Sequence, residues 1–388
     1  MKKNIAIVLI GVGNASGGAE RFFASLPAIF NNLNSTVYSL KLITDTNSLS
    51  NLESFLDLGS HTNILAYKTQ NNRLKTALEL LSFFSFIIIN RIKLLHFVAY
   101  GVQDFPFLSF LNKLPRFLRP RIVLNIEDCR LSETYNNPEL DTSVNNREKY
   151  SPIFNHVKFD GIYTWYENFK HWVEQENILT HPAIVRNASY CFTDVSRFKP
   201  EKTKEKSIIF AARLASIKRP LLFIEVINYL YTYHQIELEN WEVLIYGSGD
   251  LESDTQQLIN TYRLDQYLSI KYTTDLSIVL SKTSVFVSTQ DIENFTSLSM
   301  LEAMAAGNAI VAFNVGQSHY FVKHSENGYL SANGNIELMA KNILKYIKLP
   351  AEEKLKFQVK SRQLATEVHT KENFVNELQS FWQEVIRK

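Results

Sequence analysis

The chain has 388 residues, of which 45% are hydrophobic and 21% charged, and its formal net charge is +2. This length and composition are ordinary for a globular protein with two domains, each with its own core. The balanced charge gives no reason to expect a nucleic-acid partner, which would require a basic stripe. The only two cysteines, Cys129 and Cys191, lack metal-ligand spacing and suit free thiols in a reducing cytoplasm.

The first residues, Met1-Lys2-Lys3 and the apolar run Ile5–Ile10, imitate the start of a signal peptide. The run is short and continues into glycine-rich and charged sequence, so we expect a buried first strand. No stretch reaches the roughly 18 apolar residues that a membrane span needs. The richest run, Leu80–Ile89, is predicted to be a buried helix. The alternative is a helix that faces a membrane near a lipid-linked acceptor. We therefore expect a cytoplasmic protein, with peripheral contact at the cytoplasmic face of the membrane as the further possibility.

Short apolar runs alternate with longer helical patterns, which is typical of parallel α/β units. In the first half the predicted strands are Ile5–Ile10, Val37–Ile43, Leu94–Ala99, Ile122–Ile126 and Gly161–Tyr163. In the second half they are Ser207–Ala211, Glu242–Tyr246, Ser269–Tyr272, Val285–Ser288 and Ala309–Phe313. The polar stretch 195–206 separates the two series. We expect two doubly wound domains, 1–198 and 199–370, followed by a helix over 371–388.

The glycine-rich turn after the first strand has two interpretations. Its G-x-G-x-x-S pattern suggests an NAD site, but the third position is Ser16. The nearest acid at a strand end, Asp45, lies well beyond the expected ~20 residues, so this signal is weak. The alternative is that Gly17 and Gly18 open a helix whose N-terminus lets a diphosphate approach the backbone. A flexible turn is the purely structural interpretation.

Two adjacent carboxylates, Glu127 and Asp128, follow the fourth predicted strand of the first half. Adjacent carboxylates raise one another's pKa, and one kept protonated could orient or deprotonate an acceptor hydroxyl. The alternative interpretation, to which we give equal weight, is that Glu127 and Asp128 form a surface charge cluster paired with Arg130. His96, alone in a strand, is interpreted as a core residue, and Trp165 either stacks on a sugar or packs at a domain interface.

Arg213 and Lys218 follow the first strand of the second half. They are predicted to project from the carboxyl edge of the sheet, where open α/β sheets bind ligands. Two fixed cations can stabilise a leaving nucleoside diphosphate without a metal. Solvated surface charge is the alternative for this pair and is the interpretation for Arg219.

The most informative segment is 290–316. Here an acidic loop leads to a predicted helix over Ser297–Ala306, with a hydroxyl residue as N-cap and Gly307 as C-cap. Unpaired N–H groups and the helix dipole make its first turn a phosphate site. Glu302, in the second turn, is near enough to hydrogen-bond a sugar attached to the phosphates. The segment Asp291-Ile-Glu293 is the nearest approach to a D-x-D metal motif, and we expect no metal there.

This segment resembles the signature of family 4 of the glycosyltransferases, retaining enzymes of the GT-B fold. The G-G-A-E-R opening at 17–21 and the R-x4-K pattern at 213–218 are similar to that family as well. The family usually has two glutamates eight positions apart. Here that position is Asn294, and the acid is one place earlier at Glu293, as in a subgroup variant. Which of these two residues meets the donor sugar stays open.

The resemblance also implies roles for the site residues. Arg213 and Lys218 would hold the donor diphosphate together with the amides around Ser297–Ser299, and Glu302 would bind the ribose. Glu127 stands where the family often has histidine, and Asp128 matches its aspartate. The implied catalytic residues are Glu127, Asp128, Glu293, Arg213 and Lys218. The implied donor-binding residues are Gly17, Gly18, Arg213, Lys218, Gly247, Gly249, Tyr272, Glu293, Asn294, Ser297, Leu298, Ser299 and Glu302.

The implied fold is GT-B: two Rossmann-type domains facing across a cleft, with the C-terminal helix crossing back to the N-terminal domain. Phe374, Leu378, Phe381 and Trp382 supply an apolar face for that contact. The implied function is transfer of a sugar from a UDP- or GDP-linked donor to a glycan or lipid-linked saccharide, with retention of configuration. The alternatives are a nucleotide-sugar epimerase of the same fold and a non-catalytic sugar-nucleotide or glycan-binding protein. No further cofactor and no nucleic-acid partner are expected.

Overall fold

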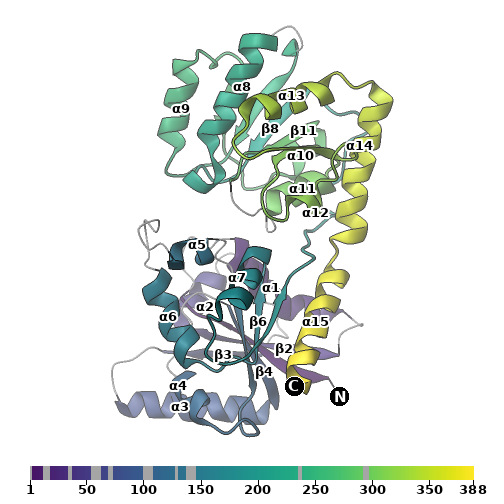
Figure 1. The fold of residues 1–388 in the computed structure, drawn as a ribbon. Coiled ribbons are helices and arrows are strands. Elements are labelled where there is room, and N and C mark those ends of the chain that lie inside the picture. Colours follow the sequence, from purple (N-terminus) through teal and green to yellow (C-terminus); the bar gives the residue numbers. More distant parts are fainter. Residues whose placement is uncertain are drawn as a thin grey trace. The chain divides into compact units, whose positions relative to one another are not determined.

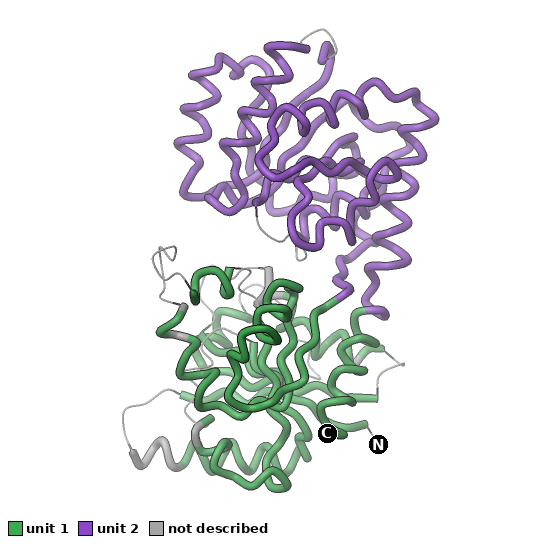
Figure 2. Tube along the Cα trace, viewed as in Figure 1, with its two compact units in different colours: residues 1–188, 374–388 green, residues 189–373 purple. Residues whose placement is uncertain are grey.

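The computed structural model describes residues 2–11, 18–33, 37–53, 63–68, 73–98, 108–126, 130–136, 146–234, 238–291 and 297–388. The chain divides into two compact units (Figure 2). Unit 1 comprises residues 1–188 and 374–388, and unit 2 comprises residues 189–373. The sequence predicts the domain boundaries at 198/199 and 370/371, so the observed boundaries differ from the predicted ones by ten and three residues. The stretch 189–198 is grouped with unit 2, where Arg362 Nη1 donates to Val195 O at 3.2 Å.

Unit 1 contains one parallel sheet of order β3-β2-β1-β4-β5-β6-β7 (Figure 1). Its strands are β1 (Lys3–Leu9), β2 (Tyr38–Asp45), β3 (Ile64–Tyr67), β4 (Ile92–Val98), β5 (Arg121–Ile126), β6 (Gly161–Thr164) and β7 (Ile184–Asn187). All five strands predicted for this half are confirmed. The two that the sequence did not reveal, β3 and β7, are four-residue edge strands with mostly half-buried residues, so their apolar signal is weak.

The helices of unit 1 are α1 (Gly18–Asn32), α2 (Thr46–Glu53), α3 (Arg73–Ile89), α4 (Leu108–Lys113), α5 (Leu131–Asn136), α6 (Asn146–His156), α7 (Glu167–Glu176) and α15 (Lys371–Arg387). The prediction that Leu80–Ile89 is buried is wrong for one side of α3. Phe83 and Ile87 are buried, whereas Leu81, Ile88 and Ile89 are exposed. Both sides of the helix are apolar, so composition alone did not distinguish the buried face from the exposed one.

The C-terminal helix packs on unit 1, which confirms the predicted return of the chain. Its predicted apolar face, Phe374, Leu378, Phe381 and Trp382, is fully buried. Trp382 Nε1 donates to Nδ1 of the buried His96 at 3.2 Å, which confirms His96 as a core residue. A Cβ on Gly161 would lie 2.8 Å from Val385 Cγ2. The glycine therefore lets α15 approach strand β6 closely.

Unit 2 contains a second parallel sheet, of order β10-β9-β8-β11-β12-β13. Its strands are β8 (Ser207–Ala211), β9 (Glu242–Tyr246), β10 (Leu268–Lys271), β11 (Val285–Ser288), β12 (Ala309–Phe313) and β13 (Gly328–Ser331). The five predicted strands are confirmed, and β13 is again an unpredicted edge strand. The chain order reverses between β8 and β11, as in Rossmann-type sheets. Ligands in such sheets bind at the carboxyl ends of the strands beside this reversal.

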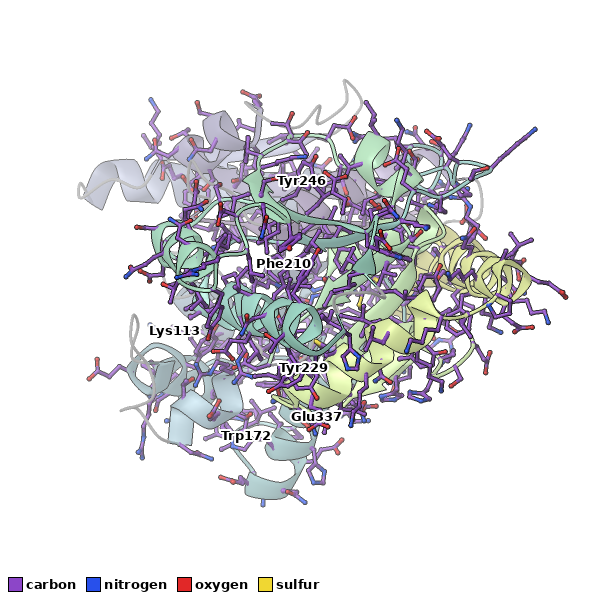
Figure 3. The ribbon with its side chains drawn as sticks, turned by 90° about the horizontal axis from the view of Figure 1, so that it is seen from above. Lys113, Trp172, Phe210, Tyr229, Tyr246 and Glu337 are labelled. Carbon is purple, nitrogen blue, oxygen red and sulfur yellow. The ribbon has the colours of Figure 1, made fainter. Side chains whose placement is uncertain are left out.

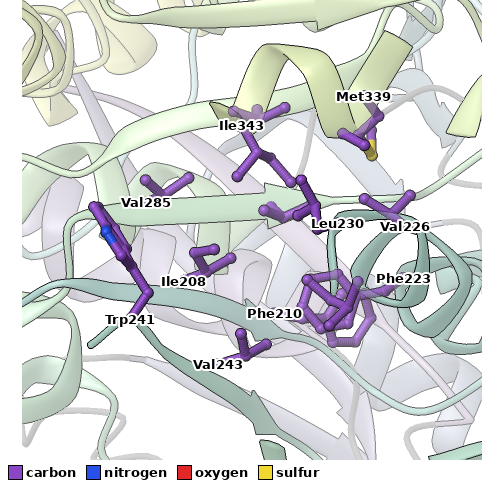
Figure 4. Packing of buried hydrophobic residues seen from close by; sticks show 14 of the residues in the cluster. Ile208, Phe210, Phe223, Val226, Leu230, Trp241, Val243, Val285, Met339 and Ile343 are labelled. Atoms are coloured by element: carbon purple, nitrogen blue, oxygen red, sulfur yellow. The ribbon is translucent and has the colours of Figure 1, made fainter. Parts of the chain in front are cut away.

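The helical elements of unit 2 are a 3-10 turn (Ser216–Lys218), α8 (Pro220–His234), α9 (Glu252–Thr261), α10 (Ser277–Lys282), α11 (Leu298–Ala305), α12 (Ser318–Phe321), α13 (Ile336–Ile347), α14 (Ala351–Gln363) and a π-helical segment (Leu364–Val368). Strand residues such as Ile208 and Val285 pack against Leu230 of α8 and Ile343 of α13 (Figure 4). This core supports the central strands β8 and β11. Among the described residues, none of the helices combines the length and the hydrophobicity that a transmembrane span requires.

Candidate functional site

The loops after β8 and β11 are joined at the point where the strand order of unit 2 reverses. Lys218 Nζ, in the loop after β8, donates to Gln290 Oε1 in the loop after β11 at 2.5 Å. Thr289 Oγ1 donates to Lys218 O at 3.0 Å and to Arg219 O at 2.9 Å. These bonds place the ammonium of Lys218 at the carboxyl edge of the sheet, where the sequence predicted it.

Arg213 lies in the same loop, and its side chain is exposed. No hydrogen bond or ion pair to another described residue holds its guanidinium. The residue after it is fixed by two backbone bonds, Leu214 N to Ser248 O at 3.0 Å and Leu251 N to Leu214 O at 2.9 Å. The backbone at Arg213 is therefore anchored while its charge is available to a ligand.

The predicted glycines after β9 explain this anchoring. Strands β8 and β9 are neighbours and carry Phe210 and Tyr246 (Figure 3). A Cβ on Gly247 would lie 1.9 Å from Ala212 O, and one on Gly249 would lie 2.5 Å from Leu214 O. Only glycine permits so close an approach of the two loops. The G-x-G turn thus supports the loop that carries Arg213.

Arg219 is not the solvated surface charge that the sequence suggested. Its Nε lies 3.1 Å from Asp291 Oδ2, and its Nη1 donates to Asn333 Oδ1 at 3.2 Å. Asn333 Nδ2 in turn donates to Asp291 O at 3.3 Å. The parallel pairing of β8 with β11 brings Asp291 within reach of Arg219, although the two are distant in sequence. This ion pair fixes the start of the acidic loop.

Helix α11 follows that loop, and Ser297 occupies its predicted N-cap position. The Ser297 side chain makes no capping hydrogen bond, so the expected hydroxyl cap is wrong in that respect. The C-cap prediction is confirmed. Gly307 has φ +74°, and Gly307 N and Asn308 N donate to Met304 O and Ala303 O at 2.9 Å each. The first-turn N–H groups have no acceptor within the helix, so they remain suited to an anion.

Two half-buried basic residues that the sequence did not single out hold the other end of α11. Lys204 Nζ donates to Ala306 O at 2.6 Å, to Ser281 O at 2.7 Å and to Asn308 Oδ1 at 3.0 Å. Arg362 Nη1 donates to Ala305 O. Cations at a helix C-terminus complement its dipole. No local motif marks these residues, because their partners lie up to about a hundred positions away.

Glu302, the predicted ribose ligand, lies largely buried in the middle of α11. Burial raises the pKa of Glu302 to about 7, while nearby Arg197 lowers it and Asp275 raises it. Arg197 Nη2 and Asp275 Oδ1 form an ion pair of 3.2 Å. Sequence reasoning missed both of these neighbours. A buried carboxylate short of hydrogen-bond donors is suited to accept bonds from a vicinal diol.

The roles predicted for several other residues are not tested by any contact in the structure. Tyr272 directly follows β10 and is 71% exposed. Gly18 begins α1. Gly17, Glu127, Asp128, Glu293 and Asn294 lie outside the described residues. Within the described ranges, no group of three or more His, Cys, Asp or Glu side chains could hold a metal ion.

Two further sequence hypotheses are decided by contacts in unit 1. Asp45 accepts hydrogen bonds from Ser48 N at 2.9 Å and from Gly11 N at 3.2 Å. Burial opposes its ionisation, but hydrogen bonds from Ser48, Gly11 and Asn47 outweigh burial and lower the pKa of Asp45. Asp45 thus caps α2 and is not free to bind a ribose. Trp165 is buried and stacks on Phe374 with ring centroids 5.9 Å apart, so it is a packing residue.

Comparison with known proteins places this site in a wider context. Residues 192–364 match the family model described as "Glycosyl transferases group 1". Over 229 residues the chain is 27% identical to the poly(ribitol-phosphate) alpha-N-acetylglucosaminyltransferase of Staphylococcus aureus (strain COL). That match takes in 53% of this chain and 45% of the relative. The chain covers less than half the length of each curated relative that it matches.

Solved structures resemble the whole chain at low identity. The sucrose-phosphate synthase of Thermosynechococcus elongatus superposes with a TM-score of 0.74 at 14% identity, covering 100% of both chains. The Anabaena protein HepE, in complex with UDP and glucose, gives a TM-score of 0.72 at 14% identity and covers 98% of this chain and 100% of its own. The fold of this protein is therefore GT-B, and its residues 192–364 carry the sequence pattern of the group 1 glycosyl transferases.

Proposed function

We propose that this protein is a family 4 glycosyltransferase that moves a sugar from a UDP-sugar to a glycan or lipid-linked saccharide acceptor with retention of configuration. The observation that carries the proposal is the arrangement at the β8/β11 reversal. There Lys218 is bonded to the loop after β11, and the anchored Arg213 has a free charge. Two cations at one site favour an anionic ligand such as a diphosphate over a neutral glycan.

In the proposed reaction, negative charge accumulates on the departing UDP as the bond from the anomeric carbon to its oxygen breaks. Arg213, Lys218 and the first-turn amides of α11 would stabilise this charge. The ammonium of Lys218 is held by Gln290 before the reaction, so its orientation costs no reorganisation. We propose that Lys218 and Arg213 together make a divalent metal unnecessary. Glu302 would accept hydrogen bonds from the ribose hydroxyls. Glu293 or Asn294 would contact the donor sugar.

The donor proposal rests on the relatives. HepE was solved with UDP, and the staphylococcal relative is named as an N-acetylglucosaminyltransferase. UDP-N-acetylglucosamine is therefore the first donor to test. The acceptor proposal is a hydroxyl of a glycan or of a lipid-linked saccharide, and Glu127 and Asp128 are the proposed acceptor-side carboxylates.

The first experiment is a thermal-shift panel of UDP, GDP and ADP on wild type, Arg213→Ala and the charge-matched control Lys202→Ala, which removes an exposed lysine of unit 2. A nucleotide at ~100 times its dissociation constant stabilises the native state by about 2.7 kcal/mol. We expect UDP to stabilise wild type and the control, and to have a much smaller effect on Arg213→Ala. Equal shifts in all three proteins would remove Arg213 from the donor site.

The second experiment measures what happens to the sugar of the donor, with and without an acceptor. A transferase forms a new glycoside only when donor and acceptor are both present, and NMR of its anomeric proton reports retention or inversion. An epimerase changes the sugar of the donor without any acceptor. A binding protein shows saturable UDP binding and leaves the donor unchanged.

A further inference from the structure

One side of unit 1 exposes an unusual concentration of apolar side chains. Of the 17 exposed large hydrophobic residues among those described, seven lie between residues 78 and 118. These seven are called the apolar ridge: Leu78, Leu81, Ile88, Ile89, Phe110, Phe117 and Leu118. Ile88 is 72% exposed, Ile89 77% and Phe117 86%. A concentration of this kind marks an interaction surface more often than scattered single residues do.

The elements that carry the ridge adjoin one another. Helix α3 lies beside α4 (Figure 1), and the rings of Phe84 and Phe110 meet with centroids 5.1 Å apart. Phe117 and Leu118 follow α4 directly in a turn. Phe83 and Ile87 already form the buried face of α3. The exposed residues of α3 are therefore a second apolar face that the core of unit 1 does not use.

An excess of positive charge borders the ridge. Asp160 is the shared partner of three arginines, with N···O distances of 3.8 Å to Arg116, 2.8 Å to Arg119 and 3.2 Å to Arg121. One carboxylate against three guanidinium groups leaves a surplus of two positive charges. Arg116 adjoins Phe117 in sequence, and its side chain is 54% exposed. The surplus charge therefore lies directly beside the most exposed residue of the ridge.

Further exposed cations lie on or next to the elements that carry the ridge. Lys113 ends α4 and is exposed. Lys158 is exposed beside α4, since its backbone N donates to Asn112 Oδ1 at 3.1 Å. Arg91 and Lys93, both exposed, follow α3. Among residues 78–93 and 108–118, Glu79 is the only acid in the sequence.

We propose that the apolar ridge and its bordering cations dock this protein on an anionic lipid membrane. The apolar side chains would enter the boundary between headgroups and acyl chains, and the cations would meet the negative headgroups. A second copy of the chain fits less well, because a symmetric contact would bring the same surplus positive charge against itself. This inference rests on unit 1 alone and is independent of the proposed transfer reaction.

The cations beside the ridge lie at the edge of the sheet opposite the one where ligands bind. Arg121 is the first residue of β5, and Lys93 the second of β4, so these cations lie at the amino edge of the sheet. Ligands of parallel α/β sheets bind at the opposite, carboxyl edge. Docking through the amino edge would therefore leave the carboxyl edge of unit 1 accessible to substrate.

The test is cosedimentation with vesicles, either of phosphatidylcholine alone or of phosphatidylcholine mixed with phosphatidylglycerol. We expect wild type to pellet with the anionic vesicles, and less so as salt rises. Ile88→Ser/Ile89→Ser should weaken this binding by about tenfold or more, because two apolar side chains no longer enter the lipid. Lys113→Glu/Arg116→Glu should abolish the preference for anionic vesicles.

The matched control is Leu355→Ser/Val359→Ser, which removes two comparably exposed apolar residues, 54% and 59%, from α14 of unit 2. It should bind vesicles as wild type does, and thermal melting should show all variants folded, since every altered side chain is exposed. Absence of wild-type binding to anionic vesicles, or an equal loss in the control, would overturn the proposal. So would a wild-type dimer in sedimentation equilibrium that Ile88→Ser/Ile89→Ser converts to monomer, because the ridge would then be a self-association surface.

Discussion

Replacing Glu302 with glutamine should separate the stability of unit 2 from its capacity to bind a nucleotide. Burial raises the pKa of Glu302 from 4.5 to about 7. The difference of about 2.5 pKa units corresponds to at most about 3 kcal/mol, at 1.36 kcal/mol for each unit. This free energy opposes folding when the carboxyl group is ionised. Glutamine has nearly the same shape and no charge to desolvate.

The pH dependence follows from the direction of the shift. Below pH 4.5 the carboxyl group is protonated in the folded and the unfolded protein, so its ionisation contributes nothing. Between pH 4.5 and about 7 the unfolded chain ionises first, and stability falls as pH rises. Above about pH 7 the full penalty applies. Relative to wild type, Glu302→Gln should therefore gain up to about 3 kcal/mol between pH 4 and pH 8.

Urea unfolding at pH 4, 6 and 8 measures this gain, with Glu239→Gln, an exposed glutamate of unit 2, as the control. Isothermal titration with UDP measures function in the same samples. We expect wild-type affinity to rise with pH through about 7, because the ionised carboxylate is the better acceptor for ribose hydroxyls. Affinity of Glu302→Gln should be lower at pH 8 and nearly independent of pH. A stability difference that does not change with pH would refute the burial argument, and unchanged UDP affinity would remove Glu302 from the donor pocket.

Three further outcomes are expected. Gly249→Ala should lower the free energy of unfolding by about 1–3 kcal/mol and weaken UDP binding, because the added Cβ would lie 2.5 Å from Leu214 O. The control is Gly334→Ala, also at positive φ but with nothing within 4 Å of the added Cβ, and it should leave UDP binding unchanged. Lys204→Met should cost about 3 kcal/mol in urea unfolding, since it leaves carbonyl groups at the ends of α10 and α11 without a donor; a loss no larger than that of Lys202→Met would contradict this role. Transfer activity, once a donor and acceptor are identified, should survive EDTA, and a loss restored by Mg²⁺ or Mn²⁺ would show that the cations of unit 2 do not suffice.

The central strands could be predicted because their signal is local. Runs such as Val285–Ser288 and Ala309–Phe313 are buried on both faces of a parallel sheet, so every position is apolar or small. The edge strands β3, β7 and β13 are short and carry no such run, and the sequence did not reveal them. Arg213 and Lys218 were recognised because cations that follow a strand end are also a local pattern, whereas the G-x-G turn was assigned through the family resemblance.

The electrostatic partners could not be predicted in the same way. Arg219 meets Asp291, Lys204 meets Ala306 and Glu302 lies near Arg197 only after the strands have paired. Each pair is separated by about 70 to 105 positions, and nothing in the sequence around one residue specifies the other.

By itself, the sequence determined where the strands and the C-terminal helix form and which loops carry chemistry, because apolar periodicity, glycine and helix caps act over a few residues. The tertiary structure decided which charges are paired, which carboxylate is desolvated and which apolar face of α3 is left exposed. Those properties depend on what packs against a side chain from elsewhere in the chain, and a one-dimensional pattern of residues does not contain that information.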